Sequence, residues 1–318
     1  MNNRGLLDLV ISILPGLMPQ ERVALAVGFD CERDLFVQSK EDLEKYLNRC
    51  LKYKWDFDES RAKAEKIDKI CRLRSIQRVS LSDESYPPLL REIHNPPVVL
   101  YFIGRLADPE KPLLGMVGTR KPGADAATQA YDIARDMGRA GVSVISGLAL
   151  GIDSASHRGN IASGIPGYAV LGSGIDEVYP SSNKILAKKI LENSGAIISE
   201  YSPGTPPDKW RFPERNRIIA ALSRGVLIVQ APKKSGALIT AYMALDQGKD
   251  VWVASSGIKK QGIFDIRGTE KLESEGAQVV YSARDILERW NIQPQEIENN
   301  ENGSDIISSM ANYLEVEI

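Results

Sequence analysis

The stretch KWRFPERNRIIAALSR, at residues 209–224, has a composition with a clear chemical meaning. Two aromatic residues, Trp210 and Phe212, stand among its cations, and the only acid is Glu214. Such interleaving suits single-stranded nucleic acid, because cations can follow the phosphates while a ring stacks on a base. The alternative is a solvated basic helix start whose aromatic rings pack into the core. The five cations are Lys209, Arg211, Arg215, Arg217 and Arg224.

Four glycine-bordered turns each follow an apolar run and precede an amphipathic segment. Backbone amides at the start of a helix bind anions, and glycine lets the backbone approach a phosphate closely. In the first turn, Thr119 adds a hydroxyl group and Arg120 adds a planar, bidentate donor. The alternative for each turn is a plain strand-to-helix connection. The turn residues are Gly118, Thr119, Arg120, Lys121, Ser146, Gly147, Gly172, Ser173, Gly174, Ser235 and Gly236.

Signals for catalysis are weaker. Asp153 and His157 lie four residues apart, so they share one face of a helix and could form a general-base pair. A structural pair is favoured, because no nucleophile lies on a G-x-S-x-G turn. Gly172-x-Gly174 begins like a dinucleotide fingerprint, but Glu177 occupies the place of the third glycine, and no G-x-x-x-x-G-K-[ST] loop exists. We therefore expect no enzyme activity, no metal site and no cofactor.

The elements that must position these residues alternate along the chain. Short apolar runs predict strands at 113–117, 142–146, 168–171, 196–199, 226–229 and 251–254. Amphipathic segments lie between them, and the clearest is a helix over 125–140 that Gly141 ends. This alternation predicts an α/β fold with a doubly wound, mainly parallel sheet. The glycine turns then follow the carboxyl ends of strands, where ligands of such folds bind.

The remaining segments divide the chain into domains. Residues 1–80 are predicted to be a small helical domain, with helices near 6–14, 41–50 and 60–74. Residues 81–112 form a proline-containing connector with a short strand at 98–103, and residues 113–288 form the α/β domain. Residues 289–318 form an acidic tail in which a short helix near 304–314 is possible. From Asn291 on, the tail has six acids and no Lys or Arg.

Composition limits the classes of function. The 318 residues carry 40 Lys and Arg against 42 Asp and Glu, a formal charge of -2, so nucleic-acid binding would require a local basic patch. The apolar runs are too short to span a bilayer, and the N-terminus lacks the shape of a signal peptide. The three cysteines, Cys31, Cys50 and Cys71, lie far apart and are read as reduced thiols. We expect a cytoplasmic protein without a membrane partner.

The order of several motifs resembles the bacterial DNA-processing protein A (DprA, or Smf) family. The motifs are YPPLLREIHNPPVVLYFIG, MVGTRKPG, VISGLALGIDSASH, AVLGSGIDEVYPSSN, GAIISEYSPGTPP, FPERNRIIAALS and SGALITA, within residues 80–287. The resemblance implies an extended Rossmann-like domain, preceded by a small domain like a sterile alpha motif. It also implies a homodimer that binds single-stranded DNA without catalysis and loads the RecA recombinase on incoming DNA during natural transformation.

The resemblance also implies roles for single residues. Arg120 would contact a phosphate, while Lys209 and Phe212 would bind a phosphate and stack on a base. The turns at Ser146-Gly147, Gly172-Ser173-Gly174 and Ser235-Gly236 would line the same pocket with backbone amides. The run Arg215-Asn216-Arg217 matches a family motif that is expected to support the pocket as much as touch DNA.

The chain departs from the family pattern in the second half of this pocket. Five positions differ from the residue that is usual in the family. Leu150 replaces arginine, Gln230 replaces glutamate and Ala237 replaces serine. Glu270 replaces asparagine or histidine, and Glu273 replaces an apolar residue. These departures leave a second hypothesis, a Rossmann-like sensor or processing enzyme for a small nucleotide. The nucleotide-cleaving families carry a P-G-G-x-G-T-x-x-E motif, which this chain lacks. A purely structural partner protein would leave the glycine turns unexplained.

Overall fold

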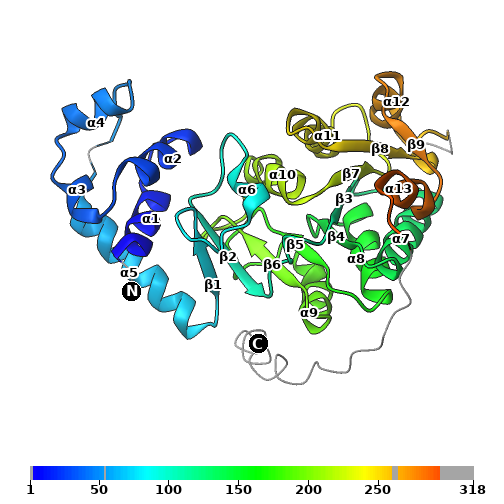
Figure 1. Cartoon of the computed structure of the whole chain (residues 1–318), viewed down its shortest axis with the longest axis horizontal. Helices are drawn as coiled ribbons and strands as arrows, with labels where there is room; N and C mark the ends of the chain where they lie inside the picture. The colour runs from blue at the N-terminus through cyan, green and yellow to red at the C-terminus, as the bar shows by residue number, and fades with distance from the viewer. Residues whose placement is uncertain (1–2, 54, 260–263, 294–318) are drawn as a thin grey trace. The chain divides into compact units, whose positions relative to one another are not determined.

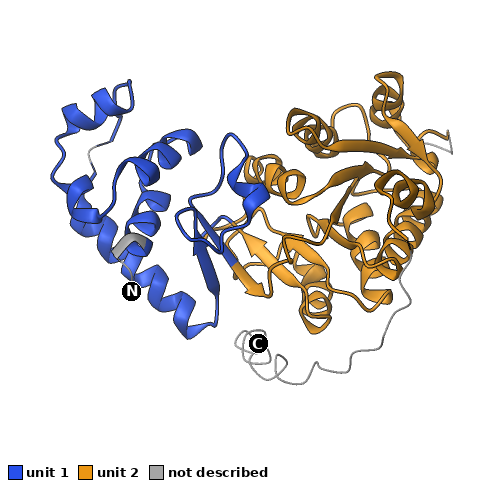
Figure 2. Cartoon of the chain, viewed as in Figure 1, with its two compact units in different colours: residues 1–101, 200–203 blue, residues 102–199, 204–318 orange. Residues whose placement is uncertain are grey.

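A computed structural model describes residues 3–53, 55–259 and 264–293. The chain divides into two compact units (Figure 2). Unit 1 comprises Met1–Tyr101 with Glu200–Pro203, and unit 2 comprises Phe102–Ser199 with Gly204–Ile318. The boundary falls inside the segment predicted as a connector. The possible helix at 304–314 lies outside the described residues.

Unit 1 is mainly helical. The predicted helix at 6–14 is confirmed by α1, which ends at Ile13 and whose apolar residues Leu7, Val10 and Ile11 are fully buried. The predicted helix at 41–50 is shorter, because Asn48 adopts a positive φ of 51° soon after its end. The segment to residue 80 is not helical throughout, since it ends in strand β1. The elements are α1 (Asn3–Ile13), α2 (Pro19–Gly28), α3 (Glu32–Phe36), α4 (Lys40–Tyr46), α5 (Phe57–Leu73), β1 (Gln77–Ser80) and α6 (Pro88–Arg91).

Unit 2 is built on a parallel sheet. Its strands run in the order β6-β5-β4-β3-β7-β8-β9, and every neighbouring pair is parallel. All six strands predicted from 113 to 254 are confirmed, with ends that shift by one residue at most. The strands are β3 (Leu113–Val117), β4 (Ser143–Ser146), β5 (Tyr168–Val170), β6 (Ala196–Ser199), β7 (Gly225–Ile228), β8 (Asp250–Ala254) and β9 (Gln278–Val280). Strand β2 (Val99–Gly104), predicted at 98–103, crosses the boundary between the units.

Helices cover both faces of this sheet (Figure 1). Helices α7, α8, α9 and α13 lie on one face, and α10 and α11 lie on the other. One core cluster joins Met116 of β3 and Trp252 of β8 to Met137 of α7 and Trp290 of α13. The helices are α7 (Ala124–Arg139), α8 (Ile152–Ala162), α9 (Lys184–Glu192), α10 (Arg211–Leu222), α11 (Gly236–Asp246), α12 (Arg267–Ser274) and α13 (Ala283–Trp290), with 3-10 turns at Ser181–Asn183 and Ser255–Gly257.

The strand order reverses direction between β3 and β7. From β3 the chain moves outward through β4, β5 and β6, and then returns to place β7 on the other side of β3. In doubly wound sheets, ligands bind beyond the carboxyl ends of the strands at such a switch point. The predicted fold class is therefore confirmed, and its binding edge is defined. No helix among the described residues is long and apolar enough to cross a membrane.

Candidate nucleic-acid interface

A buried arginine ties together the loops at the carboxyl ends of β4 and β5. Arg215, on α10, is only 4% exposed. Its Nη1 donates hydrogen bonds to the carbonyl oxygens of Gly147, at 3.0 Å, and Val170, and its Nε donates to Oδ1 of Asn216 at 3.1 Å. A Cβ atom on Gly147 would lie 2.4 Å from Arg215 Nη2, so glycine is required there. Arg215 therefore holds the loops rather than presenting its charge to solvent.

Asp153 braces the turn between β4 and α8. Its Oδ2 accepts hydrogen bonds from the backbone N–H groups of Gly147 (3.1 Å) and Ala149 (3.3 Å). Burial raises the pKa of Asp153, while the positive charge of Arg215 acts in the opposite direction. The structural interpretation of Asp153 is supported, because both of these contacts are to backbone amides at the start of the helix.

His157 lies on the same helix and is fully buried. Neither ring nitrogen has a hydrogen-bond partner among the described residues. Burial, with a smaller contribution from the charge of Arg215, lowers the pKa of His157 to about 3. The imidazole is thus neutral near pH 7 and does not form the predicted pair with Asp153.

A small cavity opens beside Arg215. Its volume is about 70 Å³, and it is lined by Arg120, Gly147, Ala149, Leu150, Tyr179, Pro180, Phe212 and Arg215. The Phe212 ring lies against Gly172, where a Cβ atom would come within 2.6 Å of the ring. The guanidinium carbon of Arg120 and the Tyr179 ring each lie 5.5 Å from the centre of the Phe212 ring. A cation and two aromatic rings therefore meet at this edge of the sheet.

The hydroxyl groups of the glycine turns are used within the protein. Ser146 Oγ donates to the carbonyl oxygen of Met116 at 2.6 Å, and Ser173 Oγ donates to that of Glu177 at 2.6 Å. Both serines are buried. Ser235 caps α11, since its Oγ accepts from the N–H group of Leu238 at 3.4 Å. The hydroxyl groups of Ser146 and Ser173 are therefore used to shape the loops.

Gln230, one of the departures from the family pattern, connects two parts of the β3–α7 loop. Its carbonyl oxygen accepts from the N–H group of Thr119 at 2.8 Å, and its Oε1 accepts from that of Gly123 at 2.9 Å. The loop that carries Arg120 is thereby fixed to the end of β7. On the other side, Gly118 packs closely on Ile152, because a Cβ atom would lie 2.6 Å from its side chain.

The structure brings some predicted residues together and separates others. Arg120, Gly147, Phe212 and Arg215 line one cavity, and Gly172 supports Phe212. The other predicted residues surround this cavity or lie farther along the edge. Of these, Lys121 and Lys209 are exposed, and Asn216 donates to the carbonyl oxygen of Gly236 at 3.2 Å. Arg217 is 3% exposed, and its Nη1 donates to the carbonyl oxygen of Glu214.

Sequence reasoning missed Tyr179 as a site residue. It follows the glycine-rich loop at the end of β5. That position was a usable signal, because an aromatic residue soon after a strand's carboxyl end belongs to the binding edge. Tyr179 is 44% exposed, so its ring is accessible to a ligand.

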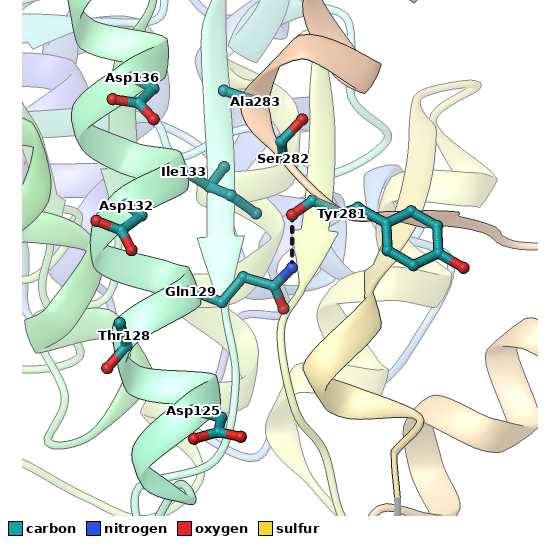
Figure 3. Close-up of a pocket in the computed structure, with 9 residues that line it drawn as sticks. All are labelled: Asp125, Thr128, Gln129, Asp132, Ile133, Asp136, Tyr281, Ser282 and Ala283. Carbon is teal, nitrogen blue, oxygen red and sulfur yellow. Dashed lines mark hydrogen bonds between the residues drawn. The ribbon is translucent and has the colours of Figure 1, made fainter.

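Charges are distributed unevenly over unit 2. Five cations on the loops of the binding edge are exposed, and none forms an ion pair within the described ranges. They are Arg120, Lys121, Lys209, Lys233 and Lys234. In contrast, a cavity of about 300 Å³ between α7 and the β9–α13 connection is lined by the carboxylates of Asp125, Asp132 and Asp136 (Figure 3). In this acidic cavity Asp132 and Asp136 form ion pairs with Arg135 and Arg139, so phosphate is expected to favour the exposed cations of the strand-end loops.

This arrangement defines a Rossmann-like α/β protein with exposed cations and aromatic rings at the carboxyl edge of its sheet. Residues 77–291 match the sequence model of the DNA recombination-mediator protein A family. The chain therefore belongs to that family.

Individual relatives agree with this assignment. The chain is 38% identical to DNA processing protein DprA of Bacillus subtilis (strain 168) over 220 residues, which cover 68% of this chain and 72% of the relative. It is 31% identical to Protein Smf of Borreliella burgdorferi over 308 residues, 97% of this chain and 96% of the relative.

Two solved structures are also similar. The X-ray structure of DNA processing protein A from Streptococcus pneumoniae aligns with a TM-score of 0.72 and 30% identity, covering 94% of this chain and 99% of that one. The protein from Helicobacter pylori aligns with a TM-score of 0.59 and 26% identity, covering 69% and 97%. The latter structure concerns that protein's unique mode of binding single-stranded DNA.

Proposed function

We propose that this protein binds single-stranded DNA at the carboxyl edge of its parallel sheet and mediates recombination by loading RecA on DNA taken up in natural transformation. The proposal includes a homodimer as the acting form and the cytoplasm as its location. Family membership and the DNA-binding relative from Helicobacter pylori support it. The observation that carries it is the meeting of Arg120, Phe212 and Tyr179 beside exposed lysines.

Each side chain of the cluster has a distinct role in this proposal. Phe212 offers a ring on which an unpaired base stacks, and Gly172 lets that ring sit against the backbone. Arg120 holds the neighbouring phosphate with two parallel hydrogen bonds, and Lys209 neutralises a second phosphate. Arg215 holds the loops at the ends of β4 and β5 through its hydrogen bonds to Gly147 and Val170. The backbone N–H groups of Thr119, Gly147 and Gly174 already donate to Gln230, Asp153 and Thr205, so in this proposal the side chains bind the phosphates.

The alternative, an enzyme that processes a small nucleotide, finds less support in the site. A general base must reach the substrate proton directly or through one water molecule. Asp153 is 5% exposed and accepts from two backbone N–H groups, while His157 is fully buried. The proposal therefore assigns binding without catalysis.

Titration of oligo-dT binding against salt concentration tests the proposal. For a single strand, log K falls with log salt with a slope of about -0.7 per phosphate neutralised. Arg120→Ala and Lys209→Ala should each flatten the slope by about that amount. Phe212→Ala should keep the slope and weaken binding by about 1–3 kcal/mol, roughly 5- to 150-fold.

Lys188→Ala supplies the matched control, because Lys188 is an exposed lysine on α9, away from the strand-end loops. It should leave both affinity and slope unchanged. A slope in Arg120→Ala equal to that of the unchanged protein would contradict the phosphate role of Arg120. Equal losses in Lys188→Ala and Lys209→Ala would indicate a non-specific charge effect.

A further inference from the structure

We propose a second stacking site for the same DNA strand, formed by Phe264 with Lys121, Lys233 and Lys234, on the β7–β8 side of the switch point. The inference rests on the proposed single-strand binding. It extends the contact with the strand from one stacked base to several nucleotides along the edge of the sheet. It concerns residues beyond the cavity described above, none of which lines that cavity.

The first step is the placement of the Phe264 ring. Phe264 is 40% exposed although it is a large apolar side chain. It packs on Gly123, the residue that precedes α7, where a Cβ atom would lie 3.3 Å from both Cδ2 and Cε2 of the ring. One part of the ring is thus supported by backbone while another part faces solvent. Phe212 is supported by Gly172 in the same manner.

The second step is the connection of the loops around this ring. Gly123 donates its N–H to Gln230 Oε1 at 2.9 Å, which joins the β3–α7 loop to the β7–α11 loop. Gly268 donates its N–H to the carbonyl oxygen of Ala231 at 2.9 Å, which joins the start of α12 to the β7–α11 loop. Loops from β3, β7 and β8 therefore form one surface around Phe264.

The third step is the charge of that surface. Lys121, Lys233 and Lys234 are exposed, and no ion pair within the described ranges involves them. Asp265 is matched by Arg267, whose Nε and Nη2 donate to its two carboxylate oxygens at 2.9 and 2.8 Å.

One acid, Asp125 in the first turn of α7, is also exposed close to this surface. An exposed ring among unpaired cations matches the requirements of a single strand, in which phosphates and stacking bases alternate.

The fourth step is the path between the two rings. Arg120 lies over Phe212, and Lys121, the next residue in the chain, belongs to the loop on which Phe264 packs. A strand that stacks on Phe212 and contacts Arg120 is thus led across the end of β3 toward β7 and β8. This occupant is favoured over a protein partner, because the exposed Phe264 ring lies here among exposed lysines.

Tryptophan fluorescence tests the second site. The chain has four tryptophans, all described, and only Trp210 is exposed, at 55%, while Trp55, Trp252 and Trp290 are 9% exposed or less. The double variant Trp210→Phe, Phe264→Trp therefore carries its single exposed indole at the proposed site. Oligo-dT long enough to reach from Phe212 should quench this indole. Shorter oligomers that bind, as fluorescence anisotropy shows, should not quench it.

The matched control is the double variant Trp210→Phe, Tyr281→Trp. Tyr281 is 67% exposed and borders the acidic cavity, so DNA should not quench an indole there. In parallel, Phe264→Ala should weaken binding of long oligo-dT about five-fold or more, while Tyr281→Ala should not.

Two results would overturn the second site and leave the proposed function intact. The first is tight binding of long oligo-dT that does not quench the indole of the Phe264→Trp variant. The second is an affinity for long oligo-dT that is unchanged in Phe264→Ala. Absence of any oligo-dT binding by the unchanged protein would overturn both.

Discussion

Arg211 and Arg215, four residues apart on the same helix, show that residue type alone does not determine the role of a side chain. Arg211 is partly exposed and lies over Trp210, with its guanidinium carbon 4.9 Å from the ring centre, whereas Arg215 is buried among backbone carbonyl groups. Both belong to one run of cations in the sequence. The two roles are distinguished only by the hydrogen-bond partners of Arg215, which lie at the ends of β4 and β5.

The buried role of Arg215 leads to a stability prediction. Arg215→Ala leaves the carbonyl oxygens of Gly147 and Val170 without this donor and removes the positive charge near Asp153. Because a buried charge without compensation is costly, we expect a loss of roughly 3 kcal/mol or more in the free energy of unfolding. Urea denaturation measures it. Arg120→Ala, at an exposed position, should change stability by less than about 0.5 kcal/mol.

The opposite outcome would be informative. If Arg215→Ala unfolded at the same urea concentration as the unchanged protein and lost only DNA binding, Arg215 would be a phosphate ligand and not a support for the loops.

His157 predicts a dependence of stability on pH. The pKa of His157 is lowered to about 3 in the folded protein, whereas its ordinary value is near 6.5. At a pH between these two values, the imidazole therefore binds a proton in the unfolded state but not in the folded state. The stability that the neutral imidazole contributes is complete above pH 6.5 and is lost as pH falls toward 3. Between pH 7 and pH 5 the loss is on the order of 2 kcal/mol.

Replacement of the imidazole by a ring that does not titrate isolates this contribution. His157→Phe should show a smaller decrease in the free energy of unfolding between pH 7 and pH 5, by about that amount. Both proteins contain the same acids, so their contributions cancel in the comparison. Parallel pH profiles for the two proteins would contradict the buried, neutral state of His157.

At the scale of elements, the turn between β4 and α8 depends on a glycine that faces the Arg120 loop. Gly151 has φ 79° and ψ -122°, and a Cβ atom there would lie 2.4 Å from the carbonyl oxygen of Thr119. Gly151→Ala should therefore cost roughly 3 kcal/mol or more and displace the loop that carries Arg120, which weakens oligo-dT binding.

Gly164 is the matched control for backbone strain, because its φ is 80° and no atom lies within 4 Å of a Cβ built there. Gly164→Ala should cost about 1 kcal/mol and leave DNA binding unchanged. Thermal unfolding and oligo-dT titration of the two variants measure both effects. Equal losses of stability and of oligo-dT affinity in the two variants would show that neither depends on the contact between Gly151 and the Arg120 loop.

Much of the fold could be predicted because the signals were local. A continuous apolar run bounded by glycine is sufficient to identify a buried parallel strand, as in β3 and β7. Strands β1 and β9 were missed, since they have only four and three residues and partly exposed side chains. Strand β5 is equally short, but its three residues are buried, whereas β1 and β9 begin with the polar residues Gln77, Arg78 and Gln278.

The candidate site was predictable at the level of loops but not of contacts. The glycine turns do meet at one edge, because the carboxyl ends of parallel strands must coincide. Whether a side chain there points outward depends on partners distant in the sequence. Ser146 donates to Met116 on the neighbouring strand, and Tyr179 lies against Phe212, 33 positions further along the chain. No pattern within one segment contains that information.

At the scale of the whole molecule, a formal charge of -2 coexists with a cationic binding edge. The excess of acids is spread over other surfaces, including the α7 face of Figure 3. Binding of nucleic acid must then depend on local geometry and stacking, with electrostatic attraction confined to the sheet edge. A protein of this design should discriminate between nucleic acids by the availability of unpaired bases rather than by charge.

The most direct test is therefore the affinity of the full chain for single-stranded and double-stranded DNA of the same length at one salt concentration. Because duplex bases are unavailable to Phe212 and Tyr179, we predict about ten-fold or more tighter binding of the single strand. The preference should shrink in Phe212→Ala. Equal or tighter binding of the duplex would contradict the proposal that this edge grips an unpaired strand.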